Sequence, residues 1–296
     1  MSQPKPGDFR GLPRPRKSFS KLTGLLSGLP KWVWPLGGLL LAALLALGIW
    51  LVAQVWPEAE DLTWQRILDT RVIRVCTDPS WPPFEYIDER TGEIKGLDAD
   101  LASALAARLR PQGPAVRAEM VPVGFDSLYD ALLASRCDAV LSALPYEAER
   151  TEDVAYAISY FNAGMVIVAR DDTADITGLD SLPGRVVGVE WGFVPEGDSR
   201  QQLLLQELSL RRYDTAGDAL RALQAGEIDA ALVDQVSALA FLHECQGLRI
   251  AGRPFTDVSY VIPVRLDAFR LLAEVDRVLI EMREDGTLAG LMDRWF

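Results

Sequence analysis

Short apolar segments alternate with amphipathic segments along residues 71–296. Residues 71–76 alternate apolar and polar positions and predict a first strand. Apolar runs predict further strands at 116–123, 139–141, 185–189 and 228–233. Helical spacing predicts helices at 62–68, 101–109, 128–134, 201–208, 216–225, 235–243 and 268–283. Strands that alternate with helices predict an α/β fold with parallel sheets covered by helices on both faces.

One segment of this pattern occurs twice. Residues 131–141 and 222–232 are identical at six of eleven positions, and each copy reads as a helix end, a tight turn, an aspartate and a buried strand. Apolar stretches at 164–168 and 258–264 flank the second copy and are interpreted as two crossover strands of a hinge. The sequence therefore predicts two lobes, one from 71–165 with 258–296 and one from 166–257.

The amino-terminal part of the chain differs in composition. Residues 1–31 are basic and rich in Pro, Gly and Ser, which predicts a disordered tail. Residues 32–56 carry no charge and have tryptophans towards both ends, and the 24 residues 32–55 alone span roughly 36 Å as a helix. We interpret this run as an uncleaved signal anchor, with a cleaved signal peptide as the alternative. A linker over 57–70 then leads to an extracytoplasmic domain.

The charge is unevenly distributed. Residues 1–56 hold seven of the 30 Lys and Arg residues and one of the 42 acids, so this part carries +6 and the remainder −18. An acidic body argues against nucleic acid as a partner, because binding to phosphates requires clustered basic residues.

The chain has three cysteines, Cys76, Cys137 and Cys245, and a single histidine, His243. They form no metal-binding spacing, and no catalytic motif or cofactor fingerprint is present. We interpret Cys76 and Cys137 as small core residues rather than as a disulfide.

Residues with candidate ligand-binding side chains follow the predicted strands. Arg150 follows the strand at 139–141, and its planar guanidinium suits a carboxylate, although a surface arginine is the simpler alternative. The proline-rich loop over 77–86 follows the first strand and holds Trp81 and Phe84; we expect Trp81 to meet a ligand and Phe84 to pack. Asp98 and Asp100 are interpreted as caps of the next helix.

The order of these segments resembles the polar amino-acid family of extracytoplasmic solute-binding proteins of ABC transporters, from about residue 64 to 296. The resemblance is carried by six motifs: Ile73-Arg-Val with Thr77-Asp-Pro-Ser-Trp-Pro-Pro-Phe-Glu, Gly96-Leu-Asp-Ala-Asp-Leu, Asp138-Ala-Val-Leu-Ser with Glu149-Arg, Gly188-Val-Glu-Trp-Gly, Gly226-Glu-Ile-Asp-Ala-Ala-Leu-Val-Asp, and Asp285-Gly-Thr-Leu with Arg294-Trp-Phe. It implies a two-lobed periplasmic-binding-protein-like fold of type II.

The resemblance also implies roles for single residues. Arg150 matches the position of the arginine that binds the ligand α-carboxylate in the family. Asp234 matches the position of the aspartate that accepts the α-ammonium, and a helix cap is the alternative role for Asp234. Trp81 and Phe125 match positions that sandwich the ligand side chain, and Asp78 matches an acid that meets a polar or cationic one. Backbone groups near three further positions would support the carboxylate: Ser142, Gly192 and Val194.

This sequence departs from the family pattern in both lobes. Pro145 and Glu147 replace two hydroxyl-bearing positions before Arg150, and Phe193-Val194 replaces two more after Gly192. The added acid would repel an anionic ligand, so these changes favour a cationic or neutral polar one.

We therefore expect a membrane-anchored solute-binding protein of an ABC importer, without catalysis or cofactor, that delivers a small polar amino acid or related amine-bearing acid to a permease. Two alternatives remain. One is a ligand-sensing input domain. The other is a cyclohexadienyl or arogenate dehydratase-like enzyme on the same fold, for which Glu147 or Glu190 would be the candidate acid.

Overall fold

The computed structural model describes residues 42, 44–48, 60–109, 113–193 and 205–296. Residues 61–296 form one compact unit. The predicted tail and most of the predicted anchor at 32–56 lie outside the described residues, as does half of the predicted helix at 201–208. No helix within the described ranges combines the length and the apolar character needed to span a membrane.

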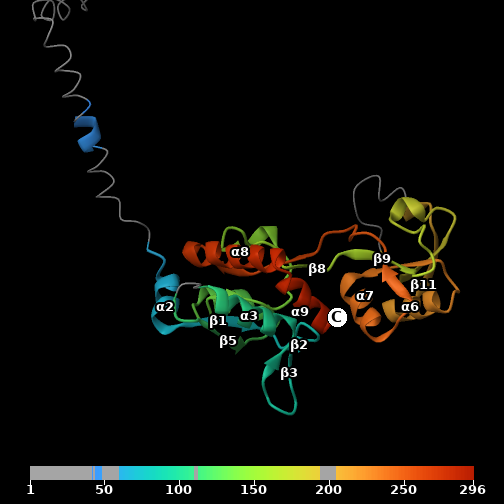
Figure 1. Ribbon diagram of the computed structural model, residues 1–296, viewed down its shortest axis with the longest axis horizontal. Helices are drawn as coiled ribbons and strands as arrows, with labels where there is room; N and C mark the ends of the chain where they lie inside the picture. The colour runs from blue at the N-terminus through green and yellow to red at the C-terminus, as the bar shows by residue number, and fades with distance from the viewer. Residues whose placement is uncertain (1–41, 43, 49–59, 110–112, 194–204) are drawn as a thin grey trace, which may run out of the picture. The chain divides into compact units, whose positions relative to one another are not determined.

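The first lobe is built on a five-stranded sheet in the order β5-β1-β6-β15-β7, of which Figure 1 labels β1 and β5. Its strands are β1 (Val72–Thr77), β5 (Arg117–Pro122), β6 (Ala139–Val140), β7 (Val154–Tyr156) and β15 (Pro263–Arg265). Its helices are α2 (Leu62–Thr70), α3 (Leu97–Arg108), α4 (Leu128–Leu133), α8 (Phe269–Glu284) and α9 (Thr287–Trp295).

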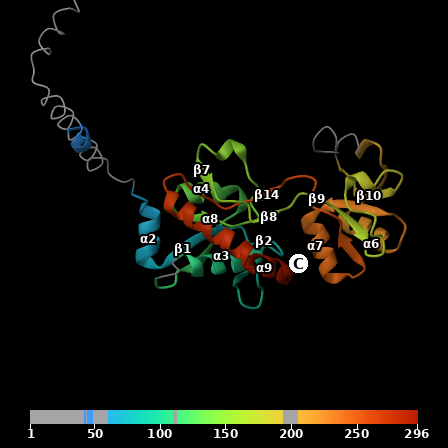
Figure 2. The same ribbon diagram turned by 45° about the horizontal axis from the view of Figure 1, so that its top comes forward.

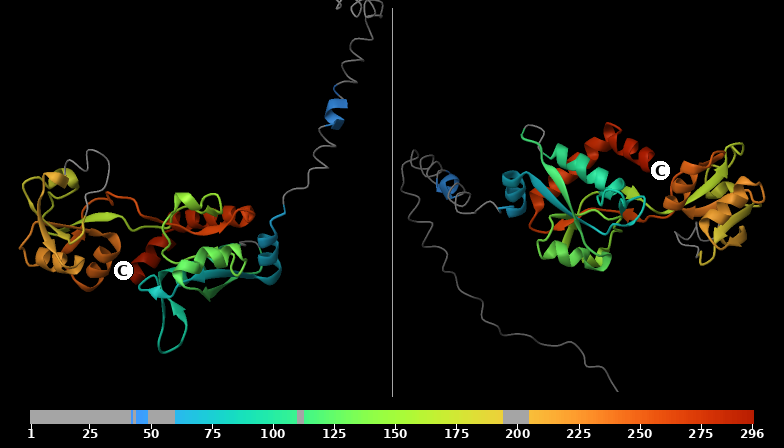
Figure 3. Two further views of the ribbon diagram at one scale, coloured as in Figure 1. Left: turned by 180° about the vertical axis from the view of Figure 1, so that it is seen from behind. Right: turned by 90° about the horizontal axis from the view of Figure 1, so that it is seen from below.

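Side-chain alternation along β1 divides this lobe into two cores. Ile73 and Val75 face the cluster that holds α3, α8 and α9, whereas Cys76 faces the cluster that holds α4. Figures 2 and 3 show α8 and α9 alongside α3. The sheet is therefore covered on both faces, as the sequence predicts.

The second lobe repeats this plan with the strand order β11-β10-β12-β9-β13. Its strands are β9 (Met165–Arg170), β10 (Val186–Glu190), β11 (Ser209–Tyr213), β12 (Ala230–Asp234) and β13 (Leu248–Ile250), and α6 (Ala216–Gln224) and α7 (Gln235–Glu244) pack together on one face. Ile167, Val187 and Leu232 face a separate cluster on the opposite side, which includes the 3-10 helix η3 (Leu179–Ser181).

The repeated segment has the same local geometry in both lobes. Ser135 and Gly226, which occupy equivalent positions, both adopt positive φ angles, of 58° and 76°. The aspartate that follows then accepts a backbone N–H from the neighbouring strand: Asp138 from Arg74 at 2.7 Å and Asp229 from Val186 at 2.8 Å. The shared sequence therefore encodes the same turn in both lobes, and in each sheet the aspartate after this turn holds the neighbouring strand through a hydrogen bond.

Neither sheet is purely parallel. β1 is parallel to β5 and β6, and β10 is parallel to β11 and β12, but β9 and β15 run antiparallel to their neighbours. Met165 at the start of β9 pairs with Asp234 at the end of β12, so β9 enters its sheet from the carboxyl edge. The expectation of parallel sheets is corrected for these strands.

The chain runs between the two sheets twice. The connecting stretches pair antiparallel as β8 (Phe161–Asn162) and β14 (Ser259–Tyr260). The stretch predicted as the first crossover, 164–168, is instead mostly β9 of the second sheet, and the second, 258–264, holds β14 and the start of β15. The lobe boundaries predicted above remain a proposal.

The two cysteines of the first lobe are bonded. Cys76 in β1 and Cys137 before β6 form a disulfide with a Cα–Cα distance of 5.6 Å, and both are fully buried. The prediction of unbonded core thiols is wrong, because the pairing of β1 with β6 brings together two residues that are 61 positions apart. Cys245 is a free thiol.

The start of α3 is fixed by a backbone contact instead of by a predicted cap. The N-cap is Gly96 (φ 132°), and the N–H groups of Leu97 and Asp98 donate to the carbonyl oxygens of Pro83 and Phe84. A Cβ at Gly96 would lie 2.0 Å from the Phe84 oxygen. The loop after β1 is therefore attached to the amino terminus of α3, and Asp98 and Asp100 lie within the first helical turn.

Candidate functional site

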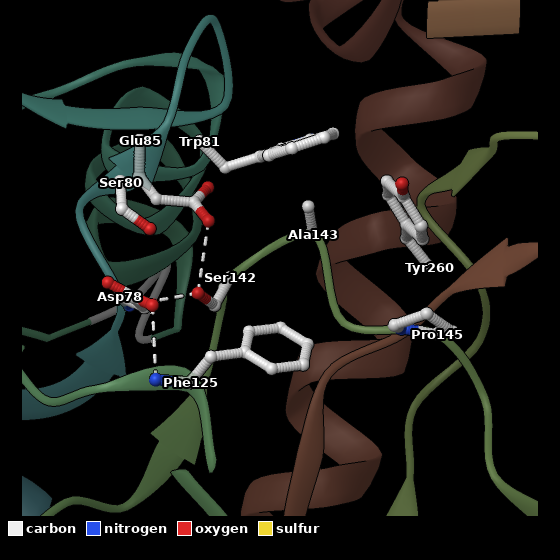
Figure 4. Close-up of a pocket in the computed structure, with 9 residues that line it drawn as sticks. All are labelled: Asp78, Ser80, Trp81, Glu85, Phe125, Ser142, Ala143, Pro145 and Tyr260. Carbon is white, nitrogen blue, oxygen red and sulfur yellow. Dashed lines mark hydrogen bonds between the residues drawn. The ribbon is translucent and has the colours of Figure 1, made fainter. Parts of the chain in front are cut away.

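A pocket of about 340 Å³ opens on the first lobe where β1 and β6 end. Figure 4 shows the rings of Trp81, Phe125 and Tyr260 around this space, with Ala143 between them. Trp81 and Phe125 are 55% and 48% exposed. The nine lining residues are Asp78, Ser80, Trp81, Glu85, Phe125, Ser142, Ala143, Pro145 and Tyr260. They include two acids and no base, a composition that suits a cation with apolar flanks.

Each aromatic wall comes from a different element. Trp81 ends the short strand β2 (Ser80–Trp81), which pairs with β3 (Glu85–Ile87), and β3 pairs in turn with β4 (Ile94–Lys95). Phe125 opens the 3-10 helix η1 (Phe125–Ser127), immediately before α4. Tyr260 lies in β14 and forms an isolated bridge with Pro145. The walls of the pocket therefore come both from the edge of the first sheet and from β14, in the segment that crosses between the sheets.

Asp78 is held in place by two backbone contacts. Its own N–H donates to Ser142 Oγ at 2.9 Å, and its carboxylate accepts the Phe125 N–H at 3.0 Å (Figure 4). These bonds tie the ends of β1 and β6 to η1. The carboxylate is thus oriented by the protein and retains acceptor positions for a ligand donor.

A buried acid pair lies behind Asp78. Ser142 Oγ donates to Glu85 Oε1 at 3.0 Å, and Asp98 Oδ2 accepts from the Ala143 N–H at 2.7 Å and from the Tyr160 hydroxyl at 3.0 Å. Glu85 and Asp98 are 1% and 0% exposed. Burial, reinforced by the neighbouring Asp98 charge, raises the pKa of Glu85 to about 10, and burial raises the pKa of Asp98 to about 6.

Ala143 carries backbone strain at the pocket wall. Its φ of 42° lies in the left-handed region, which costs a residue with a Cβ about 1–3 kcal/mol. The hydrogen bond from its N–H to buried Asp98 offsets part of this cost. The acid pair therefore also shapes the wall.

Arg150 does not line this pocket. It ends the 3-10 helix η2 (Ala148–Arg150), and its guanidinium lies 3.7 Å from Glu147, 3.9 Å from Asp153 and 4.9 Å from the Tyr129 ring centroid. Tyr129 and Tyr156 share a hydroxyl–hydroxyl bond of 2.8 Å. The proposed carboxylate-binding cation is thus paired with acids of its own segment.

The predicted residues of the second lobe lie at the carboxyl ends of neighbouring parallel strands. Gly192 (φ 89°) follows β10, and Asp234 ends β12. Asp234 accepts the Ser237 N–H at 2.8 Å and caps α7, which is compatible with a ligand role. Val194 lies outside the described residues.

The structure brings together four predicted site residues, Asp78, Trp81, Phe125 and Ser142, in one pocket. Phe84 packs as expected, fully buried against Phe161, Tyr260 and Phe296. Sequence reasoning gave no ligand role to Glu85, Ala143 or Tyr260. The one sequence signal for Glu85 is that it directly follows Phe84, an aromatic residue that the sequence predicts to pack.

Comparison with known proteins assigns the chain to a family. Residues 73–296 match the model of the bacterial extracellular solute-binding proteins, family 3. The chain belongs to this family. Its periplasmic-binding-protein-like, two-lobed α/β fold agrees with an ancestral cationic amino acid solute binding protein (TM-score 0.57, 29% identity), which matches over 79% of this chain and 99% of the other.

Curated relatives of this family 3 protein bind amino acids. The L-cystine-binding protein TcyJ of Escherichia coli K12 is 27% identical over 80% of this chain and 87% of its own length. The lysine/arginine/ornithine-binding periplasmic protein of the same strain is 28% identical over 76% and 87%. An ancestral cyclohexadienyl dehydratase shares the fold, with a TM-score of 0.69 and 24% identity over 80% of this chain and 97% of its own.

Proposed function

We propose that this family 3 protein captures a small amino acid with a cationic side chain and delivers it to the permease of an ABC importer. The observation that carries the proposal is the first-lobe pocket, whose lining combines two acids with three aromatic rings and no base. The names of relatives that bind lysine, arginine, ornithine or cationic amino acids support the same ligand class.

In this proposal the ligand side chain lies between Trp81 and Phe125 and directs its charge to Asp78. A cation over an aromatic face contributes about 0.5–2 kcal/mol, depending on its desolvation. The hydrogen bond from Phe125 N–H fixes Asp78 before the ligand arrives, which lowers the entropy cost of binding.

The α-carboxylate and α-ammonium would be bound by Arg150 and Asp234, with backbone N–H groups near Ser142, Gly192 and Val194 in support. The two charged residues belong to different lobes, so a zwitterion bound to both would favour the closed form of the protein. Arg150 would have to exchange its contacts with Glu147 and Asp153 for the ligand.

We further propose that residues 32–56 anchor the protein in the cytoplasmic membrane and that residues 57–296 face outward. The uncharged run with terminal tryptophans supports the anchor. The Cys76–Cys137 disulfide supports an oxidising, extracytoplasmic location, because such bonds are rare in the cytosol.

We propose binding without catalysis. The two acids considered from the sequence are accessible to solvent, with the Glu147 side chain 43% exposed and Glu190 exposed at the end of β10, so burial does not prepare either as a general acid. Formation of phenylpyruvate from prephenate by the purified protein would contradict this proposal.

A thermal-shift screen of the full chain against the common amino acids tests the binding proposal. A ligand at 100 times its dissociation constant stabilises by about 2.7 kcal/mol, which raises Tm by several degrees. We expect such a shift with arginine, lysine, ornithine or histidine and a smaller one with glutamine. No shift with any amino acid would refute the proposal.

A further inference from the structure

The acid pair behind the pocket has a hydrogen-bond connection to the proposed cation site. The Asp78 N–H donates to Ser142 Oγ, and Ser142 donates to Glu85 Oε1. Glu85 itself lines the pocket (Figure 4). A change in the charge of Glu85 is therefore felt by a ligand in the pocket and by the residues that hold Asp78.

One oxygen of each acid has no donor. Among the described residues, Glu85 Oε2 and Asp98 Oδ1 are buried side-chain atoms without a hydrogen-bond partner from the rest of the protein. The two carboxyl groups interact directly with each other. Two ionised carboxylates would leave both oxygens unsatisfied, whereas a single proton placed between them supplies the missing donor.

The surroundings of the pair oppose a second negative charge. Among the described residues, the titratable side chains that act most strongly on Glu85 and Asp98 come from five elements or their flanks, and none of these side chains is a cation: Asp78 after β1, Tyr160 before β8, Tyr260 in β14, and the two acids themselves in β3 and α3. Burial, together with the neighbouring Asp98 charge, raises the pKa of Glu85 and so favours a proton on the pair.

We propose that Glu85 and Asp98 hold one proton between them in the ligand-free protein and that a cationic ligand group in the pocket releases this proton to solvent. The ligand part of this inference rests on the proposed function. A positive charge a few ångströms from a carboxyl group favours its ionised form. Glu85 then becomes a second acid for the cation, beside Asp78.

Proton release gives the site a stronger preference for a cationic ligand over a neutral one than Asp78 alone provides. A neutral ligand of the same shape leaves the pair with its proton and meets one ionised acid in the pocket lining, Asp78, whereas a cation meets two, Asp78 and Glu85. By linkage, the affinity for the cation rises with pH, by up to tenfold per pH unit where a full proton is released. The affinity for the neutral analogue does not change with pH over the same range.

Titration calorimetry tests the release, with arginine as the probe and citrulline as its neutral match. Full-length protein is titrated at pH 7 in two buffers of different ionisation enthalpy. We expect a substantial fraction of a proton to be released with arginine and none with citrulline. Glu85→Gln mimics the protonated acid and should bind arginine without release, whereas Glu93→Gln, on an exposed turn, should behave like wild type.

Two results of this titration would overturn the proposal. One is arginine binding without proton release in the wild type. The other is undiminished release in Glu85→Gln, which would place the proton elsewhere. Absence of binding by arginine and lysine would refute the coupling to a cation, and the proposed ligand class with it.

A ligand-free measurement separates the shared proton from the proposed function. Because the pKa of Glu85 is raised on folding, its favourable contribution is complete below about pH 4.5 and is lost as the pH rises towards 10. Chemical unfolding from pH 5 to 9 should show stability falling less steeply with pH in Glu85→Gln than in wild type. Parallel profiles would refute the shared proton whether or not any ligand binds.

Discussion

At the residue scale, two charged groups of the first lobe differ in their readiness for a ligand. Asp78 lines the pocket and is oriented by the Phe125 N–H. Arg150 lies outside the lining and contacts Glu147 and Asp153. The lobe thus presents an oriented acid in its pocket, while the arginine proposed to bind a carboxylate contacts two neighbouring acids.

The substitution Glu147→Gln tests this competition. Removing the acid frees Arg150, and an exposed pair is worth about 0.2–1 kcal/mol, so the affinity for an amino acid ligand should rise by about 1.5- to 5-fold. Calorimetric titration with arginine measures it. Glu149→Gln makes the same charge change two residues away, and an equal gain there would show that net charge alone is responsible.

Several site residues could be predicted from the sequence: Asp78 and Ser142 through the family resemblance, and Trp81 also because its loop follows the first strand. Glu85 and Tyr260 could not. Glu85 meets Asp98 across a strand and a helix, and Tyr260 reaches the pocket only through the pairing of β14 with β8. Asp98 was wrongly interpreted as a cap, since an acid near a helix start normally serves there.

At the element scale, the junction between the site loop and α3 is the most constrained contact. The Pro83 and Phe84 carbonyl groups accept the first N–H groups of the helix, and Gly96 permits this close approach. The position of Trp81 and Glu85 therefore depends on a backbone contact.

The substitution Gly96→Ala should destabilise the protein. A positive φ costs about 1–3 kcal/mol for a residue with a Cβ, and the contact with the Phe84 oxygen adds to this loss. Urea unfolding measures the change. Gly290→Ala is the control: Gly290 lies within α9 with open space around it, so alanine should be neutral or stabilising there. Unchanged stability in Gly96→Ala would show that the junction is not tight.

Most elements could be predicted because apolar periodicity reports burial directly: α4 and α7 lie within a residue of their predicted ends. The Cys76–Cys137 bond could not, since it depends on the pairing of distant strands. The direction of β9 and β15 was missed for a related reason, because the edge at which a strand enters a sheet is set by the path of the chain.

At the scale of the whole molecule, the family assignment, the two sheets and the disulfide support capture of a solute outside the cytoplasm. The central claim is that the first-lobe pocket recognises a positive charge through Asp78. The acid pair behind Asp78 and the aromatic rings beside it belong to the same proposed cation site.

Calorimetric titration of arginine and glutamine against wild type and Asp78→Asn tests this claim most directly. Asparagine keeps an acceptor for the Phe125 N–H but removes the charge, and loss of a charged hydrogen bond costs about 1.5–3 kcal/mol. We predict that Asp78→Asn weakens arginine binding by about 10- to 150-fold and glutamine binding far less. Equal affinity of wild type and Asp78→Asn for arginine would contradict the account.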